Sequence, residues 1–206
     1  MIAADIFSEI EYHLLHDEKP SDYLNRVSDG PLFREYPLTM LGRLKETEQS
    51  PKYHPEGSVW NHTVLVLDEA ARCREKSSST RVFMWAALLH DIGKPDTTQN
   101  RKGRITSYNH DRIGAELCTK FLREFGCEDP FIRDVSALVR WHMQLLFVTK
   151  SLAFANVQAM MAQTNIEDVA LLGFCDRMGR LGADREEQKK NIALFLEKCR
   201  MHSKNI

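Results

Sequence analysis

The sequence predicts an all-α protein built as a helical bundle. Apolar residues recur at the spacing of one helix face through most of the 206 residues, and alternating strand patterns are nearly absent. The length suits one domain with a sizeable core, and 43% hydrophobic with 28% charged residues is typical of a globular protein. We divide the chain into a short N-terminal helical annex, residues 1–50, and a main bundle, residues 51–206.

Composition narrows the classes of partner and compartment. The formal net charge is −1, whereas a dedicated nucleic-acid binder usually carries a basic excess, so we expect no long nucleic acid as partner. The chain contains no apolar run of 18 residues and no basic, apolar leader, so we expect neither a membrane span nor a signal peptide. Five cysteines without a CxxC pair indicate reduced thiols, and we expect a cytoplasmic protein.

The first third of the chain predicts three helices and several breaks. Residues 4–16 carry apolar positions at helical spacing. Residues 19–22, Lys-Pro-Ser-Asp, break that helix and offer a cap for the next one. Residues 38–44 predict another helix, and a long polar loop follows as far as Ser58.

The middle of the chain predicts the centre of the bundle. One helix runs from Trp60 to about Glu75, and a second begins at Thr80. The second helix is apolar nearly all round, which is typical of a helix buried in a bundle. It ends in the pair His90-Asp91, and Gly93 is expected to stop it. Residues 96–107 are interpreted as a polar loop.

Four further helices complete the prediction. Two amphipathic segments span residues 111–125 and 129–147. Asn165, with Asp168 three positions later, predicts a capping arrangement for the next helix. A charged helix over residues 184–201 closes the chain.

Two acidic residues lie at positions that the sequence pattern predicts to be buried. Burying a carboxylate costs several kcal/mol unless it is paired or binds a metal, so Asp91 at the end of an apolar helix implies a charged partner. Asp176 also follows small and apolar residues one and two turns back, and is expected to point inward. Simpler readings exist: His90 and Asp91 can form an ordinary helix end, and Asp176 can pair with Arg177 or Arg180.

The order of these residues resembles the HD superfamily of metal-dependent phosphohydrolases. Its pattern is a His, a His-Asp pair and a distant Asp, here His62, His90-Asp91 and Asp176. Residues 53–63 (YHPEGSVWNHT) are similar to the segment that opens the HD part of bacterial tRNA nucleotidyltransferases, and the likeness spans roughly residues 38–182. The nucleotidyltransferase head and its motif are absent from these residues, so tRNA end synthesis is not expected. The main bundle is accordingly interpreted as an HD phosphohydrolase domain.

The resemblance implies a metal site with four protein ligands, namely His62, His90, Asp91 and Asp176. Two imidazoles and two carboxylates suit a divalent Fe, Mn, Ni, Co or Zn ion, and suit Mg less well. His54 and Glu56, in the loop before the first ligand, are candidates for orienting it or for a structural role.

Two further histidines, His110 and His142, leave the number of metals open. Superfamily members with histidines at these places hold a second metal, with the motif Asp bridging. In the alternative, one metal binds and these histidines contact phosphate or donate a proton. We favour one metal over two from the sequence alone, so the expectation is one or two divalent ions per chain.

The expected activity is hydrolysis of a phosphoester by a metal-activated water. The likeness implies a small phosphorylated substrate, foremost a nucleotide, for a phosphodiesterase or a phosphatase of the nucleotidase type. The expected catalytic residues are Asp91, Lys94, His110 and His142. The expected substrate-binding residues are Lys94, Arg104, Arg177 and Arg180.

Two alternatives remain. One is a non-catalytic nucleotide-sensing or scaffold module that keeps a metal in a site closed to solvent. The other is a hydrolase of signalling nucleotides or of deoxynucleoside triphosphates. The sequence indicates neither the natural substrate, nor the oligomeric state, nor the role of residues 1–50.

Overall fold

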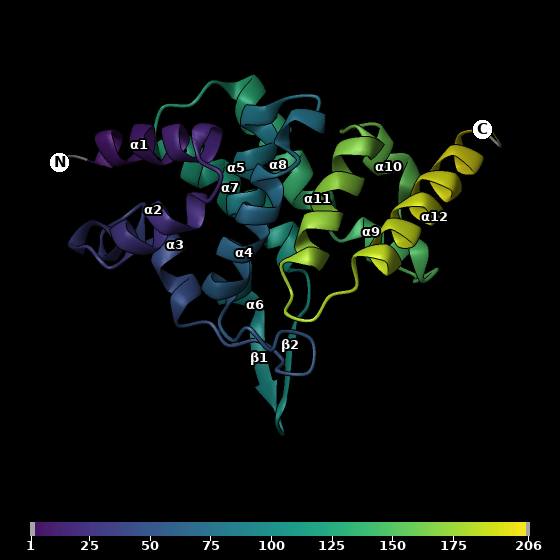
Figure 1. Cartoon of the computed structure of the whole chain (residues 1–206), viewed down its shortest axis with the longest axis horizontal. Helices are drawn as coiled ribbons and strands as arrows, with labels where there is room; N and C mark the ends of the chain where they lie inside the picture. The colour runs from purple at the N-terminus through teal and green to yellow at the C-terminus, as the bar shows by residue number, and fades with distance from the viewer. Residues whose placement is uncertain (1–2, 205–206) are drawn as a thin grey trace.

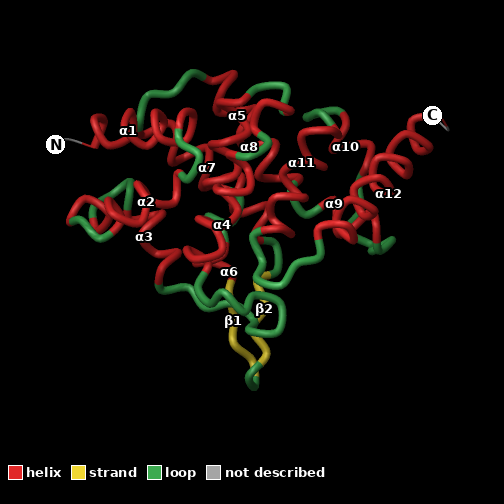
Figure 2. Tube along the Cα trace, viewed as in Figure 1, coloured by secondary structure: helices red, strands yellow, loops and turns green. Residues whose placement is uncertain are grey.

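A computed structural model describes residues 3–204 and confirms the all-α prediction (Figure 1). Helices make up almost all the regular structure, and the exception is a short two-stranded hairpin that protrudes from one end (Figure 2). Within residues 3–204, no helix is both long and apolar enough to cross a membrane.

The helices fall into an N-terminal set, a central set and a C-terminal set. The N-terminal helices are α1 (Ala3–His16), α2 (Pro20–Ser28) and α3 (Thr39–Gly42), with 3-10 turns at Pro31–Arg34 and Arg43–Lys45. The central helices are α4 (Val59–Ala71), α5 (Thr80–Leu89), α6 (Lys94–Thr97), α7 (His110–Glu124) and α8 (Asp129–Trp141), with a 3-10 turn at Arg74–Lys76. The C-terminal helices are α9 (Gln144–Thr149), α10 (Val157–Met161), α11 (Ile166–Met178) and α12 (Arg185–Lys204).

Helix α5 lies at the centre of the bundle, as its apolar sequence predicts. Residues 83–89 are fully buried, and α5 packs against α1, α4, α8 and α11. The N-terminal annex joins the same core, because Ile10 and Leu14 of α1 are also fully buried within it. The annex and the bundle thus share one apolar core, and a domain boundary at residue 50 stays a prediction.

The stretch from 96 to 107 is not the loop that the sequence predicted. After α6 it forms an antiparallel hairpin of β1 (Thr98–Arg101) and β2 (Arg104–Ser107), in which Thr98 faces Ser107. Its two-residue turn is Lys102-Gly103, with φ angles of 53° and 79°. Two successive positive φ angles are the geometry that closes a tight hairpin. This turn, rather than alternating apolar residues, makes the strands.

Local signals also misplaced one helix end and one cap. The helix expected over 129–147 is interrupted around His142, between α8 and α9. Asn165 does cap α11, accepting from the Glu167 amide at 2.8 Å. Asp168 does not complete the cap, because its carboxylate accepts hydrogen bonds from the amide and hydroxyl of Ser78 instead. Asp168 therefore binds Ser78, which lies on the loop before α5, instead of the amides at the start of its own helix.

Candidate metal centre

The structure brings three of the four residues expected to bind metal, His62, His90 and Asp91, into one cluster, and Asp176 adjoins that cluster through His62. His62 lies in α4, His90 and Asp91 follow the last turn of α5, and Asp176 lies in α11. His62 Nε2 is 3.1 Å from Asp176 Oδ1, and His90 Nε2 is 3.2 Å from Asp91 Oδ2. All four side chains are buried. Ligand atoms of His62, His90 and Asp91 lie within 4.8 Å of one another.

Two glycines allow the helices to approach closely enough. A Cβ on Gly93 would stand 2.2 Å from the carbonyl oxygen of His110, so only glycine lets the start of α7 meet the His-Asp turn. Gly93 therefore serves close packing rather than the expected helix stop, since α5 already ends at Leu89. A Cβ on Gly179 would stand 2.5 Å from a methyl group of Val66, so this glycine lets α11 approach α4.

Three histidines have their Nδ1 atoms committed to backbone carbonyls. A nitrogen that faces a carbonyl oxygen at hydrogen-bond distance carries the ring proton, so the other nitrogen of a neutral imidazole presents a lone pair. The bonds join His90 to Ala87 (2.8 Å), His110 to Ser107 (2.6 Å) and His142 to Val139 (2.7 Å). In the neutral form of each imidazole the Nε2 atom is therefore the acceptor, which is the form that binds a metal.

The fourth histidine, His62, has no aligned hydrogen bond at Nδ1, and faces the Glu56 carboxylate there instead. The Oε1 atom of Glu56 lies 2.9 Å from His62 Nδ1 and 2.8 Å from His54 Nδ1. Burial raises the pKa of Glu56, but the contacts with His62 and His54 outweigh it and lower the pKa to about 2. Burial, together with the charge of Lys94, lowers the pKa of His54 to about 3. The ionised Glu56 thus favours the tautomer of His62 that carries its proton on Nδ1, beside Glu56. The lone pair of Nε2 then faces Asp176.

His110 and His142 form a second cluster around the same aspartate. Their Nε2 atoms are 3.2 Å apart, and lie 3.5 Å and 3.9 Å from Asp91 Oδ1. Burial lowers the pKa of His110, and burial with the neighbouring imidazoles lowers that of His142 to about 4. Near neutral pH two lone pairs thus face each other across 3.2 Å.

Charge in the centre is balanced by cations from the protein. Burial raises the pKa of Asp91, but the ammonium of Lys94, 2.6 Å away, and the neighbouring His90 hold it well below its usual range. Burial also raises the pKa of Asp176, but Arg180 at 3.1 Å and the neighbouring His62 hold it well below its usual range. The pKa of His90 is raised: burial lowers it, but the charge of Asp91 prevails.

The donor set fits a divalent cation. His90 Nε2 is buried and has no hydrogen-bond partner, although it lies beside the Asp91 carboxylate. His62 Nε2 faces a carboxylate oxygen, and the Nε2 atoms of His110 and His142 face each other. Buried acceptors that face acceptors need a proton or a cation between them. Asp91 belongs to both clusters, so its carboxylate is placed to bind a cation held by either cluster.

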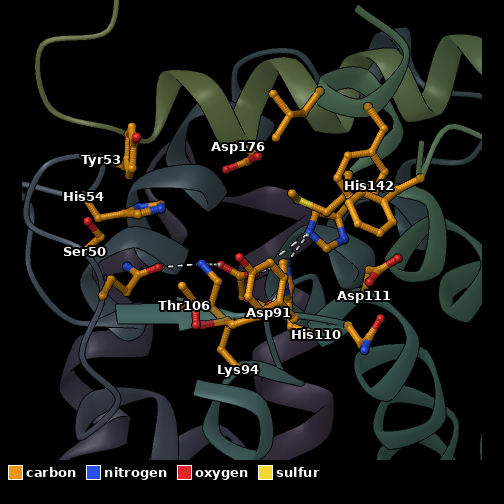
Figure 3. Close-up of a pocket in the computed structure, with 18 of the residues that line it drawn as sticks. Ser50, Tyr53, His54, Asp91, Lys94, Thr106, His110, Asp111, His142 and Asp176 are labelled. Atoms are coloured by element: carbon orange, nitrogen blue, oxygen red, sulfur yellow. Dashed lines mark hydrogen bonds and ion pairs between the residues drawn. The ribbon is translucent and has the colours of Figure 1, made fainter. Parts of the chain in front are cut away.

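The centre opens into a cavity of about 630 Å³. Figure 3 shows Lys94, Asp91, His142 and Asp176 around a common space, with His54 on one side. Arg177 and Arg180 also line it. The size lies within the range of small-molecule sites.

One predicted substrate residue lies elsewhere. Arg104 is exposed on β2 and is not part of the cavity wall, which β2 reaches with the three residues after it. The sequence placed Arg104 in a polar loop, whereas in the structure it pairs with Arg101 in the hairpin.

Sequence reasoning missed Gln49. This buried side chain accepts a hydrogen bond from the ammonium of Lys94, and its own amide nitrogen donates to the carbonyl of Ser58 at 3.2 Å. Lys94, which Figure 3 shows beside Asp91, is thereby held between Gln49 and Asp91. A lone glutamine in a polar stretch carries no signal that it lies against a residue 45 positions later.

Comparisons with known proteins agree with this arrangement. The profile of the HD domain family matches residues 59–177. A multifunctional CCA protein from Alkalilimnicola ehrlichii is 28% identical over 208 residues, covering 97% of this chain and 47% of that protein. Another multifunctional CCA protein, from Methylococcus capsulatus, is 31% identical over 133 residues, which cover 62% of this chain and 28% of that protein.

A shorter match has a higher identity. An A-adding tRNA nucleotidyltransferase from Deinococcus radiodurans is 43% identical over 87 residues, which cover 41% of this chain and 20% of that protein. The chain thus spans less than half the length of each of these relatives.

Proposed function

Because this chain belongs to the HD domain family, whose members are commonly metal-dependent phosphohydrolases, we propose that it cleaves a phosphoester of a small nucleotide or a related phosphate compound. One observation carries the proposal: the Nε2 atoms of four buried histidines gather around Asp91 and Asp176, and both carboxylates line an open cavity together with His110 and His142. The relatives are named for nucleotide transfer to tRNA, and we do not extend that activity to this chain.

The metal ligands in this proposal are His62, His90, Asp91 and Asp176. A divalent ion held there lowers the pKa of a water molecule and polarises a phosphoryl oxygen. Glu56 and the backbone carbonyls keep the histidines in the tautomer that binds it. Imidazole donors favour a first-row transition ion over Mg.

Cationic side chains supply the contacts for phosphate. Lys94, Arg177 and Arg180 line the cavity beside the ligands, where they are placed to neutralise charge that grows on the transferring group. Arg180 already holds Asp176 and reaches the cavity, so it links a ligand to the phosphate site. Lys94 does the same from the other side through Asp91.

We further propose that His110 and His142, with Asp91 as the shared carboxylate, hold a second metal ion. Their lowered pKa values make both imidazoles neutral near pH 7, so neither is a ready proton donor to a leaving oxygen. Neutral imidazoles with facing Nε2 atoms are suited to a cation instead. This supports the two-metal alternative that the sequence left open.

An open cavity favours an enzyme over a metal-containing scaffold. The scaffold alternative predicts a site closed to solvent, whereas Asp91, His142 and Asp176 are in the wall of a cavity of about 630 Å³. A structural metal normally has a closed set of protein ligands.

The test is turnover by the purified full chain after metal analysis. We expect hydrolysis of at least one member of a panel of nucleoside 2′-, 3′- and 5′-phosphates and 2′,3′-cyclic phosphates, with Mn, Fe, Co, Ni, Zn or Mg added back. Asp91→Asn should lose metal and turnover together, because Asp91 contacts both clusters. Asp134→Asn, which changes a half-buried aspartate outside the cavity, is the control. Full activity of Asp91→Asn, or metal binding without turnover of any phosphoester, would overturn the proposal.

A further inference from the structure

One wall of the cavity is apolar and aromatic, in contrast to the cationic side near the metal ligands. It is formed by the start of α9 and the loop that follows it, through Met143, Leu146, Phe147, Leu152 and Phe154. The rings of Phe147 and Phe154 pack with their centroids 5.5 Å apart at an angle of 50°. Phe147 therefore supports Phe154 from one side.

Phe154 is presented to solvent at the cavity, although burial would be expected of such a ring. Its exposed fraction is 66%, and that of Leu152 is 39%. Exposed apolar side chains grouped at a cavity are typical of a binding surface rather than of chance exposure.

The loop that carries Phe154 is fixed by a buried polar side chain. Gln144 is only 2% exposed. Its Nε2 atom donates to the carbonyl of Phe154 at 3.2 Å, and its Oε1 atom accepts from the amide of Asn156 at 2.9 Å. The amide of Leu152 also donates to the carbonyl of Phe147 at 2.8 Å. Both atoms of the Gln144 amide thus hold the ring in place.

Helix α12 holds the same turn from outside the cavity. The ammonium of Lys198 donates to the carbonyls of Val148 and Thr149, at 3.1 and 3.3 Å, and to the hydroxyl of Ser151 at 3.0 Å. A ring on a loop fixed from two sides loses little conformational entropy when a ligand stacks on it.

Resting on the proposed function, we infer that this wall, residues 143–154, is the subsite for the aromatic base of a nucleotide whose phosphate lies at the metal ligands. Base stacking on an aromatic side chain is tolerant of base identity, because every base has a π face. The polar side chains of Ser50, Thr106 and Asn109, which also line the cavity, are suited to the heteroatoms of a base. An alkyl chain makes no hydrogen bonds with these polar groups, so the cavity fits a base better than a lipid-like phosphate.

Three phosphonates test the subsite on the metal-loaded full chain, because a phosphate hydrolase does not cleave their C–P bond. They are an adenosine 5′-methylenephosphonate, hexylphosphonate and methylphosphonate, and their dissociation constants are measured by calorimetry. We expect the adenosine compound to bind at least tenfold more tightly than methylphosphonate. Hexylphosphonate should not match it.

Phe154→Leu keeps an apolar side chain and removes the ring. Because stacking on one aromatic side chain is worth about 1–3 kcal/mol and this ring is largely exposed, affinity for the adenosine compound should fall about five- to tenfold. Affinity for methylphosphonate should not change. Tyr12→Leu, which removes an equally exposed ring on α1 away from the cavity, is the matched control.

The outcomes separate this inference from the proposed function. Equal affinity for the three phosphonates, or an unchanged affinity in Phe154→Leu, refutes the subsite even if phosphoesters are hydrolysed. Hexylphosphonate binding as tightly as the adenosine compound refutes it in favour of an alkyl phosphate. Ring-dependent binding of the adenosine compound without turnover of any phosphoester supports the subsite and overturns the hydrolase.

Discussion

Replacing His142 by glutamine tests how many metal ions the centre holds. Glutamine keeps a polar side chain at this buried position but removes the imidazole Nε2 that faces His110 across 3.2 Å. His142 belongs only to the second cluster, whereas Asp91 belongs to both. Under the two-metal proposal the variant therefore loses one ion, while Asp91→Asn loses both.

The magnitude follows from the contacts that are lost. The bond from His142 Nδ1 to Val139 is worth about 1 kcal/mol, and a domain of this size loses roughly 2–4 °C in Tm for that amount, so the metal-free variant stays folded. An ion at 100 times its dissociation constant stabilises the native state by about 2.7 kcal/mol. Saturating metal should therefore raise the Tm of the wild type about twice as much as that of the variant.

The assay is native mass spectrometry of the chelated chain reloaded with Mn or Fe, with thermal melts in parallel. We expect two metal equivalents for the wild type, one for His142→Gln and two for the control His16→Gln, which changes an exposed histidine on α1. One equivalent in both the wild type and His142→Gln would refute the second site. The facing imidazoles would then have to share a proton.

Two further predictions concern charge at the centre. Lys94→Met should keep the metal but lower kcat/KM for a phosphoester about ten- to a hundredfold, since a charge-assisted contact with phosphate is lost; loss of metal instead would give Lys94 a structural role. For the metal-free protein, urea unfolding should show stability rising between about pH 4 and 6.5, because the unfolded chain binds protons at His54 and His142 there and the folded chain, with pKa values of about 3 and 4, does not. The rise is on the order of 3 kcal/mol for each histidine. Above pH 6.5 the raised pKa of His90 acts in the opposite sense, because the stability that protonated His90 contributes is lost as the pH rises through its pKa in the folded state. A stability that does not change from pH 4 to 8 would contradict these assignments.

The sequence could predict the helices because apolar spacing is a local pattern, whereas the grouping of the expected ligands came from the resemblance to the HD superfamily. Seven consecutive buried residues before His90 mark α5 as central, and the His-Asp spacing marks the motif. The hairpin at 98–107 escaped prediction because its geometry depends on two positive φ angles at Lys102 and Gly103, not on apolar alternation. Asp168 escaped because its partner, Ser78, is 90 positions away.

The base subsite had no readable signal for a related reason. Phe147 was assigned to the end of a long helix, where it would count as one more core residue. The break around His142 turns the following segment so that Phe147 and Phe154 line the cavity. Gln144, which fixes that segment, acts through an amide whose two atoms both bind backbone groups 10 and 12 positions later.

Helix ends explain why the histidines of the centre stand where they do. His90 and His142 are the C-terminal caps of α5 and α8, and each donates its Nδ1 proton to the carbonyl three residues earlier. The last carbonyls of a helix lack partners within the helix, so one imidazole both satisfies a carbonyl and fixes its own tautomer. The negative ends of two helix dipoles then lie beside the Nε2 atoms and favour a cation there. His62 lies in the first turn of α4, far from the carbonyls at the end of the helix, and faces Glu56 instead, so its place in the centre needs the loop before α4 as much as the helix itself.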